Sequence, residues 1–429
     1  MATDSNSDAY WISQTFVIFF TFLGLIGFSL IEAGLSRQKH HLICLMKNFV
    51  QISIGILVFW LLGYGFMFGD NDNEFIGEDK YGGEDWNGTY HYNRAAMYGL
   101  LGLYVVFIIN GALAERMQLW GAVFYAFWIM LFVYPVIAHW DWGKGWLQQE
   151  FDIPYIDRAG NGIVHLLAGS IALVGLIFTG SRLGRKYPAT VNIQGENFED
   201  SPATFVPASV ELFVSGYLFV ILSLFAISGF RGRDPLEDQA SAFNTLLSGS
   251  VACIVAVVFY TIASRDVTFH YEAVLQGFLS GEVAVISVAR NCEPWAAFCI
   301  GFIAGLLFAG TARLMKWMPR IDDVTNTIAV HFVNGIWGLL ATGFFDNKRG
   351  VFHEDGEGGG GLFGSQVVGF VVISGWGIFW GLVMFGILCV VSQHKVPAEV
   401  ELVGLNYASV GWRGFFIDHN KVKITRDKY

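Results

Sequence analysis

Long apolar stretches separated by short polar ones run along almost the whole chain. About eleven of them approach 20 residues, the length of helix that crosses the hydrocarbon core of a bilayer. They lie near residues 10–34, 43–69, 95–114, 118–138, 159–182, 206–227, 242–263, 270–289, 295–317, 326–345 and 363–392. This pattern predicts an all-α polytopic membrane protein with eleven transmembrane helices.

Two of these apolar runs begin with the same spacing of polar residues. Asp157 is followed by six residues and then by Val-His165, and Asp323 is followed by six residues and then by Val-His331. Eight residues of helix span about 12 Å, so an aspartate at the membrane surface places its histidine inside the hydrocarbon. Ionisable groups at that depth are costly and mark functional sites. The matched spacing favours a facing histidine pair over two unrelated packing histidines.

The position of the two motifs in corresponding spans indicates an internal repeat with its site at the repeat interface. Spans one to five, about residues 10–182, and spans six to ten, about residues 206–345, form two five-helix repeats. An odd number of spans in each repeat makes them inverted, and the span at 363–392 is an extra helix. Residues 1–392 therefore form the membrane domain and residues 393–429 a C-terminal tail.

Charged residues in the loops predict the orientation of the chain. Eleven spans put the two termini on opposite sides, and most basic loop residues fall on the side of the tail. By the positive-inside rule the N-terminus is outside and the tail is cytoplasmic. Asn87, in the sequence Asn-Gly-Thr of the long acidic loop after the second span, is then a candidate glycosylation site.

Composition supports the membrane assignment and narrows the classes of function. The chain of 429 residues is 54% hydrophobic and 14% charged, whereas soluble domains carry roughly 25% charge. Its net charge of −10 does not suggest a nucleic-acid partner. The five cysteines show no metal-type spacing, and neither histidine has further ligands at helical offsets, so no metal and no cofactor are expected. No nucleophile–base pair or phosphate-binding loop predicts an enzyme.

Other polar residues near or within the spans have ordinary explanations. Asp157 and Asp323 precede apolar helices, and capping of backbone N–H groups is favoured over direct substrate contact. Glu282 falls in the middle of a span and must be paired, protonated or facing a cavity; a hydrogen bond to a neighbouring helix is the favoured reading. Trp142 lies where an interface tryptophan is common, and its ring could also attract a cation.

Several motifs, in order along the chain, resemble the ammonium transporter/methylammonium permease/Rhesus family, and the ammonium-transporter branch in particular. The matching stretches are residues 32–35, 46–48, 111–117, 157–165, 294–305 and 321–343. The resemblance implies a homotrimer of eleven-helix protomers in the plasma membrane, each with a narrow apolar pore for ammonium or ammonia. It implies that His165 and His331 line this pore, that Asp157 is the pore-side aspartate and that Trp142 belongs to the outer vestibule.

The sequence departs from the family pattern around the pore. Counting back without gaps from residues 114–116, the two positions usually held by gate or mouth aromatics fall on Leu101 and Met97. Phe332 replaces the small residue expected after the second histidine and could plug the pore, which makes these three residues candidate gates. The sixth span lacks the expected tryptophan motif. Transport of ammonium or ammonia is the leading hypothesis. The alternatives are a non-conducting or weakly conducting sensor or structural subunit, and a transporter of another small weak base or a neutral gas.

Overall fold

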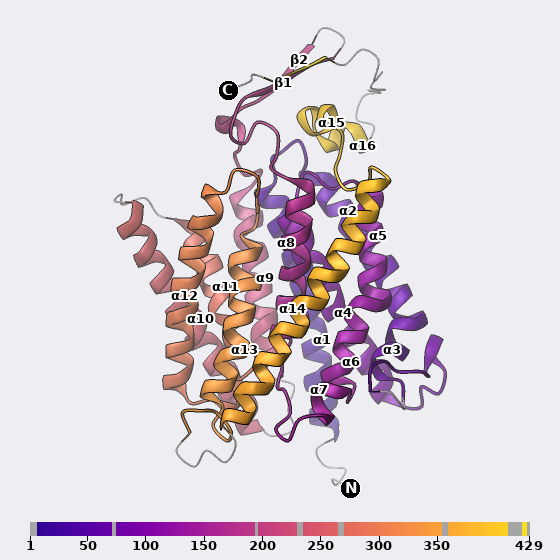
Figure 1. Ribbon diagram of the computed structural model, residues 1–429, viewed down its shortest axis with the longest axis vertical. Helices are drawn as coiled ribbons and strands as arrows, with labels where there is room; N and C mark the ends of the chain where they lie inside the picture. The colour runs from indigo at the N-terminus through magenta and orange to yellow at the C-terminus, as the bar shows by residue number, and fades with distance from the viewer. Residues whose placement is uncertain are drawn as a thin grey trace.

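The protein is a bundle of long helices with a small sheet and two short helices beyond one end (Figure 1). The computed structural model describes residues 7–70, 74–193, 196–229, 235–264, 270–353, 359–410 and 423–426. We call the end of the bundle where α1 begins the amino face, and the end that carries the sheet and the last two short helices the tail face. The two chain termini lie at opposite ends (Figure 1), as the odd number of spans predicts.

The first half of the chain supplies five membrane spans. Their elements are α1 (Ser7–Leu35); α2 (His41–Val58), η2 (Phe59–Gly63) and α3 (Tyr64–Phe68); α4 (Thr89–Ala112); α5 (Leu119–Trp128), η4 (Ile129–Val133), α6 (Tyr134–Trp142) and the short α7 (Trp146–Gln149); and η5 (Asn161–Leu166) with α8 (Leu167–Thr179). A single 3₁₀ turn, η3 (Tyr81–Gly83), lies in the loop before α4.

The second half supplies the other six spans. Their elements are α9 (Val210–Gly229), α10 (Pro235–Ser264), α11 (Tyr271–Val285) with the turn η7 (Ala289–Asn291), α12 (Pro294–Trp317), η8 (Ile328–Val333) with α13 (Asn334–Phe345), and α14 (Gly359–Val390), which crosses the bundle obliquely (Figure 1). By length and hydropathy, ten helical segments of the described chain can cross a membrane. The eleventh span is α11, which has 15 residues and packs against α10 and α12. The predicted eleven-span fold is confirmed.

The two halves meet where small residues let helix backbones approach each other. A Cβ placed on Gly27 of α1 would lie 2.6 Å from the carbonyl oxygen of Gly216 in α9, and one on Gly216 would lie 2.6 Å from that of Gly27. A side chain at either position would therefore push α1 and α9 apart. This reciprocal contact is what an internal repeat predicts at its interface.

A second sign of the repeat is that the histidine of each half lies in a π-helical turn. Residues Asn161–Leu166 form η5 and residues Ile328–Val333 form η8, and each turn contains the histidine of its half. A π-turn inserts one extra residue into a helical repeat and is frequent at functional sites. Apolar periodicity does not reveal such turns, because the hydrophobic pattern continues through them.

A three-stranded antiparallel sheet on the tail face departs from the all-α prediction. Strands β1 (Ala189–Ile193) and β2 (Glu196–Asp200) form a hairpin between α8 and α9, and β3 (Lys423–Arg426) pairs with the other edge of β1. The turn η6 (Pro202–Thr204) leads from the hairpin to α9. Strands of four or five residues in a polar loop are too short to give a hydropathy signal.

The tail after α14 packs against the bundle rather than extending away from it. The side-chain oxygen of Asn406 accepts hydrogen bonds of 3.1 Å from the backbone N–H groups of Leu42 and Ile43, at the start of α2. The tail contains α15 (Ala398–Val403) and α16 (Leu405–Val410), and Asn406 belongs to the second. The tail therefore supplies a helix cap to the membrane domain.

Candidate functional site

His165 and His331 face each other in the interior of the bundle. Their Nδ1 atoms are 3.0 Å apart, and their ring planes lie within 13° of parallel with centroids 4.9 Å apart. The exposed fractions are only 1% for His165 and 5% for His331. A facing pair was the favoured reading of the matched spacing, and these distances bear it out.

The two histidines reach this position on helices that begin at opposite faces. Asp157, ahead of η5, lines a cavity at the amino face together with Gln148 of α7, and Asp323, ahead of η8, lines a cavity at the tail face together with Arg182. The matched distance from aspartate to histidine therefore brings two separate chain segments to the same depth. Inverted repeats produce this arrangement.

The aspartates cap the helices that carry the histidines. Asp157 Oδ1 accepts hydrogen bonds of 2.9 Å from the N–H groups of Gly160 and Asn161, and Oδ2 accepts bonds of 2.8 and 2.9 Å from those of Gly162 and Ile163. Asp323 Oδ2 accepts one bond of 2.8 Å from the N–H of Ile328. The predicted capping roles are confirmed. All four of these bonds come from the backbone, so the carboxylate of Asp157 positions η5 and the histidine it carries.

The amino face is hollowed into a vestibule of about 380 Å³. Trp142 and Tyr98 line it together, with ring centroids 5.2 Å apart, and Trp142 Nε1 donates a 2.7 Å hydrogen bond to the carbonyl oxygen of Asp157. This hydrogen bond links Trp142 of the vestibule to Asp157, the residue that caps η5. Two adjacent aromatic rings offer electron-rich faces to a cation entering from this side.

The sixth span also contributes to the vestibule, although its sequence gave no motif to assign. Ser228, near the end of α9, lines the vestibule together with Ile227. Its hydroxyl is hydrogen-bonded to those of Ser241 at 2.8 Å and Thr245 at 2.7 Å, both in α10. A serine among many apolar helix residues carries no sequence signal of such a role.

The structure changes the assignment of the candidate gates. Met97 is buried, and its sulfur accepts a 3.7 Å hydrogen bond from Thr21 of α1, whereas its neighbour Tyr98 lines the amino-face vestibule. Phe332 is half-buried with its backbone against Gly169, and it is not among the residues that line the space beside His331. Its role as a plug of the pore stays a prediction. Leu101 is buried in the core, and its gating role stays a prediction.

On the tail side of the histidines the free space narrows sharply. A cavity of about 10 Å³ adjoins His331 and is lined mainly by apolar side chains, among them Phe28, Phe107, Tyr217 and Leu279. Such a volume holds about one water molecule. Beyond it, a second vestibule of about 360 Å³ opens at the tail face. The histidine pair therefore lies between two wide vestibules, beside a constriction.

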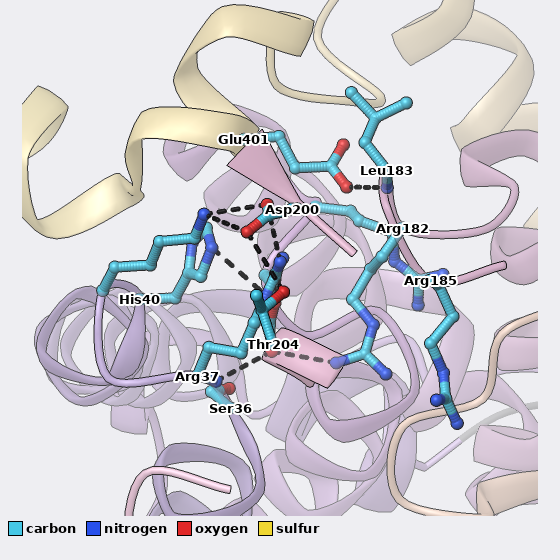
Figure 2. Close-up of polar contacts among 12 residues, drawn as sticks. Ser36, Arg37, His40, Arg182, Leu183, Arg185, Asp200, Thr204 and Glu401 are labelled. Carbon is cyan, nitrogen blue, oxygen red and sulfur yellow. Dashed lines mark hydrogen bonds and ion pairs between the residues drawn. The ribbon is translucent and has the colours of Figure 1, made fainter. Parts of the chain in front are cut away.

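A cluster of buried charges holds the tail-face ends of the helices together. Glu115 pairs with Arg37 at 2.6 Å and with Arg182 at 2.9 Å. Asp200, at the end of β2, accepts hydrogen bonds of 2.8 Å from Arg37 and Lys39 (Figure 2). The loops after α1, α4 and α8 and the hairpin are thereby tied to one another.

Glu401 of α15 attaches the tail to the same region, where its carboxylate accepts a 2.5 Å hydrogen bond from the backbone N–H of Leu183 (Figure 2). Arg116 uses its guanidinium differently, as a donor to the carbonyl oxygens of Ala112 at 2.6 Å and Asp322 at 2.8 Å. These contacts fix the tail-face ends of spans three, five and ten.

Replacing Glu115 by glutamine is expected to destabilise the folded protein by about 3–5 kcal/mol, because it removes the buried anion that lies between Arg37 and Arg182. Each arginine is then left with a single acidic partner, Asp200 for Arg37 and Asp322 for Arg182. Burial alone would raise the pKa of Glu115, but Arg182, His40 and Arg37 hold it down at about 2. Ionised Glu115 therefore stabilises the fold above its ordinary pKa of 4.5, and this stabilisation is lost as the pH falls toward about 2. Thermal unfolding of the purified protein across this range measures both effects.

Glu272→Gln is the matched control, because Glu272 pairs with Lys316 at 3.4 Å on the surface, and exposed pairs contribute little. Equal losses of stability in the two variants would contradict the assignment of Glu115 as the centre of the buried cluster.

Comparison with known proteins places this geometry in a family. The profile of the Ammonium Transporter Family matches residues 10–414. The chain belongs to this family. Ammonium transporter 1 member 3 of Solanum lycopersicum is 30% identical over 441 residues, which cover 95% of this chain and 93% of that protein. Ammonium transporter Amt2 of Archaeoglobus fulgidus is 28% identical over 425 residues, which cover 93% of this chain and 87% of that protein.

Solved structures of ammonium transporter relatives share the fold. A protein named Sensor Amt Protein superposes with a TM-score of 0.82 at 27% identity, covering 93% of this chain and 98% of that one. Mep2 of Saccharomyces cerevisiae superposes with a TM-score of 0.78 at 22% identity, covering 92% of this chain and 90% of that one. The protein is therefore an integral membrane member of a transporter family.

Proposed function

We propose that this protein transports ammonium, with ammonia as the species that passes the constriction, along a path through the histidine pair. The observation that carries the proposal is the position of His165 and His331 between two vestibules, beside an apolar space of about 10 Å³. A space this small and apolar rejects hydrated ions, whereas two imidazoles offer polar contacts to a solute that has shed its water.

The hydrogen bond between the two Nδ1 atoms determines what the pair can do. One histidine must donate its Nδ1–H to the other, which then carries its own proton on Nε2. A neutral pair thus presents one free Nε2 acceptor and one Nε2–H donor, on opposite rings. A solute between the vestibules can receive a hydrogen bond from one ring and give one to the other, and a proton can be relayed by exchange of these roles.

The finer features follow from the resemblance and remain part of the proposal. They are a homotrimer with one pathway in each protomer, an amino face outside the cell, a cytoplasmic tail face and a location in the plasma membrane. Asn87 is exposed on the amino face just before α4, where a glycan could be accommodated. No cofactor and no metal take part, and Trp142 and Tyr98 form the entry site for the cation.

A sensor is the second candidate, because the fold is shared with a protein named Sensor Amt Protein. The fold alone does not separate transport from sensing, since both need a solute to reach the vestibule. Transport additionally requires passage beside His331. Methylammonium uptake and ammonium-evoked current in cells without their own ammonium transporters test this, with expression at the cell surface measured in parallel. Saturable uptake above vector-only cells supports the proposal, and none from well-expressed protein would overturn it in favour of the sensor.

Replacing Trp142 by leucine is expected to raise the KM for methylammonium about fivefold. A cation–π contact at a partly exposed site contributes about 1 kcal/mol, which corresponds to that factor in affinity. The maximal rate should change less, because the histidines are untouched. Concentration-dependent uptake measures both parameters, with Trp146→Leu as a control, since Trp146 packs against Trp140 and Phe151 and is not among the vestibule residues. A lower maximal rate at unchanged KM would contradict a role in capturing the cation.

A further inference from the structure

Glu282 is a fully buried carboxyl group in the last turn of the membrane span α11. Its exposed fraction is 0%, and neither carboxyl oxygen has a hydrogen-bond partner among the residues that the structure describes. The sequence favoured a hydrogen bond to a neighbouring helix, and the structure contradicts this. A structural role would require such a bond, because a buried polar group without one is costly.

The position of Glu282 on α11 connects it to the proposed pathway. Leu279 lines the narrow space beside His331, and Ile286, just after α11, lines the vestibule that contains Trp142. Residues separated by three and then four positions lie on the same side of a helix. Glu282 therefore lies on the side of α11 that faces the pathway, at a depth between the two cavities.

The opposite side of α11 is occupied by a close helix contact. A Cβ on Gly281 would lie 2.3 Å from the carbonyl oxygen of Ser248, and one on Gly277 would lie 2.8 Å from the Cβ of Ala256, both in α10. These glycines mark the side of α11 that packs on α10. Glu282 is turned away from that contact by about a third of a helical turn, since adjacent residues differ by roughly 100°.

No fixed positive charge balances a carboxylate at this position. Glu282 takes part in none of the ion pairs of the described residues, and the nearest basic residue along the chain, Arg290, pairs with Glu237 at 2.6 Å at the amino face. The titratable side chains at the narrow end of the pathway are His331 and Tyr217, with His165 beside His331. The vestibule lined by Ile286 also contains Arg158, Arg290 and Arg349, but none of these arginines forms a hydrogen bond with the carboxyl oxygens of Glu282. A mobile proton or cation must therefore balance the carboxylate.

We propose that Glu282 is an internal binding site for a small protonated amine, ammonium or methylammonium, and that it holds a proton when no amine is bound. The inference rests on the proposed transport function. On binding, the carboxylic acid releases its proton to water of the vestibule, and the carboxylate formed pairs with the cation. One positive charge enters and one leaves, so the net charge of the site does not change. Glu282 thus adds a second attraction for the cation, deeper than the aromatic vestibule.

Infrared difference spectroscopy of the purified protein tests this site directly. We expect the carbonyl band of a protonated carboxylic acid to disappear when ammonium is added, with about one proton released per protomer into weakly buffered solution. Glu282→Gln should lose both signals, and Glu282→Asp, which keeps the acid on a shorter side chain, should shift the band. Ser280→Ala is the matched control, since its buried hydroxyl bonds to the carbonyl oxygen of Gln276 within the same helix.

Uptake measurements separate this inference from the proposed function. Glu282→Gln should raise the KM for methylammonium about tenfold or more, while Ser280→Ala stays within about twofold of the wild type. A wild-type protein that transports methylammonium but shows no ammonium-dependent loss of the band would overturn the Glu282 site and leave the transport function standing. If ammonium removes the band but the wild-type protein takes up no methylammonium, the Glu282 site stands and the proposed transport function is overturned. If Glu282→Gln does not fold, a shift of the ammonium-sensitive band between the wild type and Glu282→Asp still shows whether the band comes from Glu282.

Discussion

Replacing His331 by alanine is expected to reduce methylammonium uptake to the level of cells without the protein. The change removes one of the two imidazoles that provide polar contacts beside the constriction, and it leaves Nδ1 of His165 without its partner at 3.0 Å. A solute that has shed its water then loses the Nε2 contact of His331 in an apolar space, where a missing hydrogen bond costs about 1–3 kcal/mol, and the exchange of roles between the two rings is no longer possible. Uptake per protein molecule at the cell surface is the measurement.

The histidines act as a pair, which gives this prediction a sharper form. His165→Ala should reduce methylammonium uptake as much as His331→Ala does. The double variant should reduce it no further, because residues that work as a unit show strongly non-additive effects. His139→Asn is the matched control: His139 is fully buried, but its Nδ1 bonds to the carbonyl oxygen of Met67 at 2.9 Å, away from the pair. We expect it to retain most of the uptake. Independent, additive losses in the two pore variants would refute relay through the pair.

The sequence predicts the membrane fold well, because hydropathy acts over whole spans. Eleven apolar runs corresponded to eleven helical spans, and the repeated distance from aspartate to histidine located two helix caps and the facing pair. These features depend on spacing along a single helix, or on a repeat of it. They do not require knowledge of which helix neighbours which.

Features that depend on the rotation of a helix were harder to predict. An ungapped count placed the mouth residue at Met97, whereas the vestibule residue is Tyr98. One residue changes the direction of a side chain by about 100°, so a count that is off by one turns the residue away from the site. The position of Ser228 in the vestibule and the absence of a described hydrogen-bond partner for Glu282 likewise depend on how α9, α10 and α11 pack against each other.

Replacing Asp157 by alanine is expected to destabilise the folded protein by about 3–6 kcal/mol. The change removes the acceptor for four buried backbone N–H groups at the start of η5, and each unsatisfied donor costs about 1–3 kcal/mol where relaxation or water does not replace the bond. Asp157→Asn keeps one acceptor oxygen, so its free energy of unfolding should fall by roughly half as much. The unfolding temperature of the purified protein measures the series.

Asp323→Ala provides the matched control, because it changes the corresponding residue of the other half. Asp323 accepts a bond from Ile328 at 2.8 Å with only one of its carboxyl oxygens, so its loss should resemble that of a single cap, about 1–2 kcal/mol. Uptake adds a second readout. Trp142 donates its hydrogen bond to the carbonyl oxygen of Asp157, so a displaced residue 157 should also raise the KM for methylammonium. If Asp157→Ala were as stable as Asp323→Ala and lost only its maximal rate, the aspartate would have to act on the solute directly rather than through the helix that carries His165.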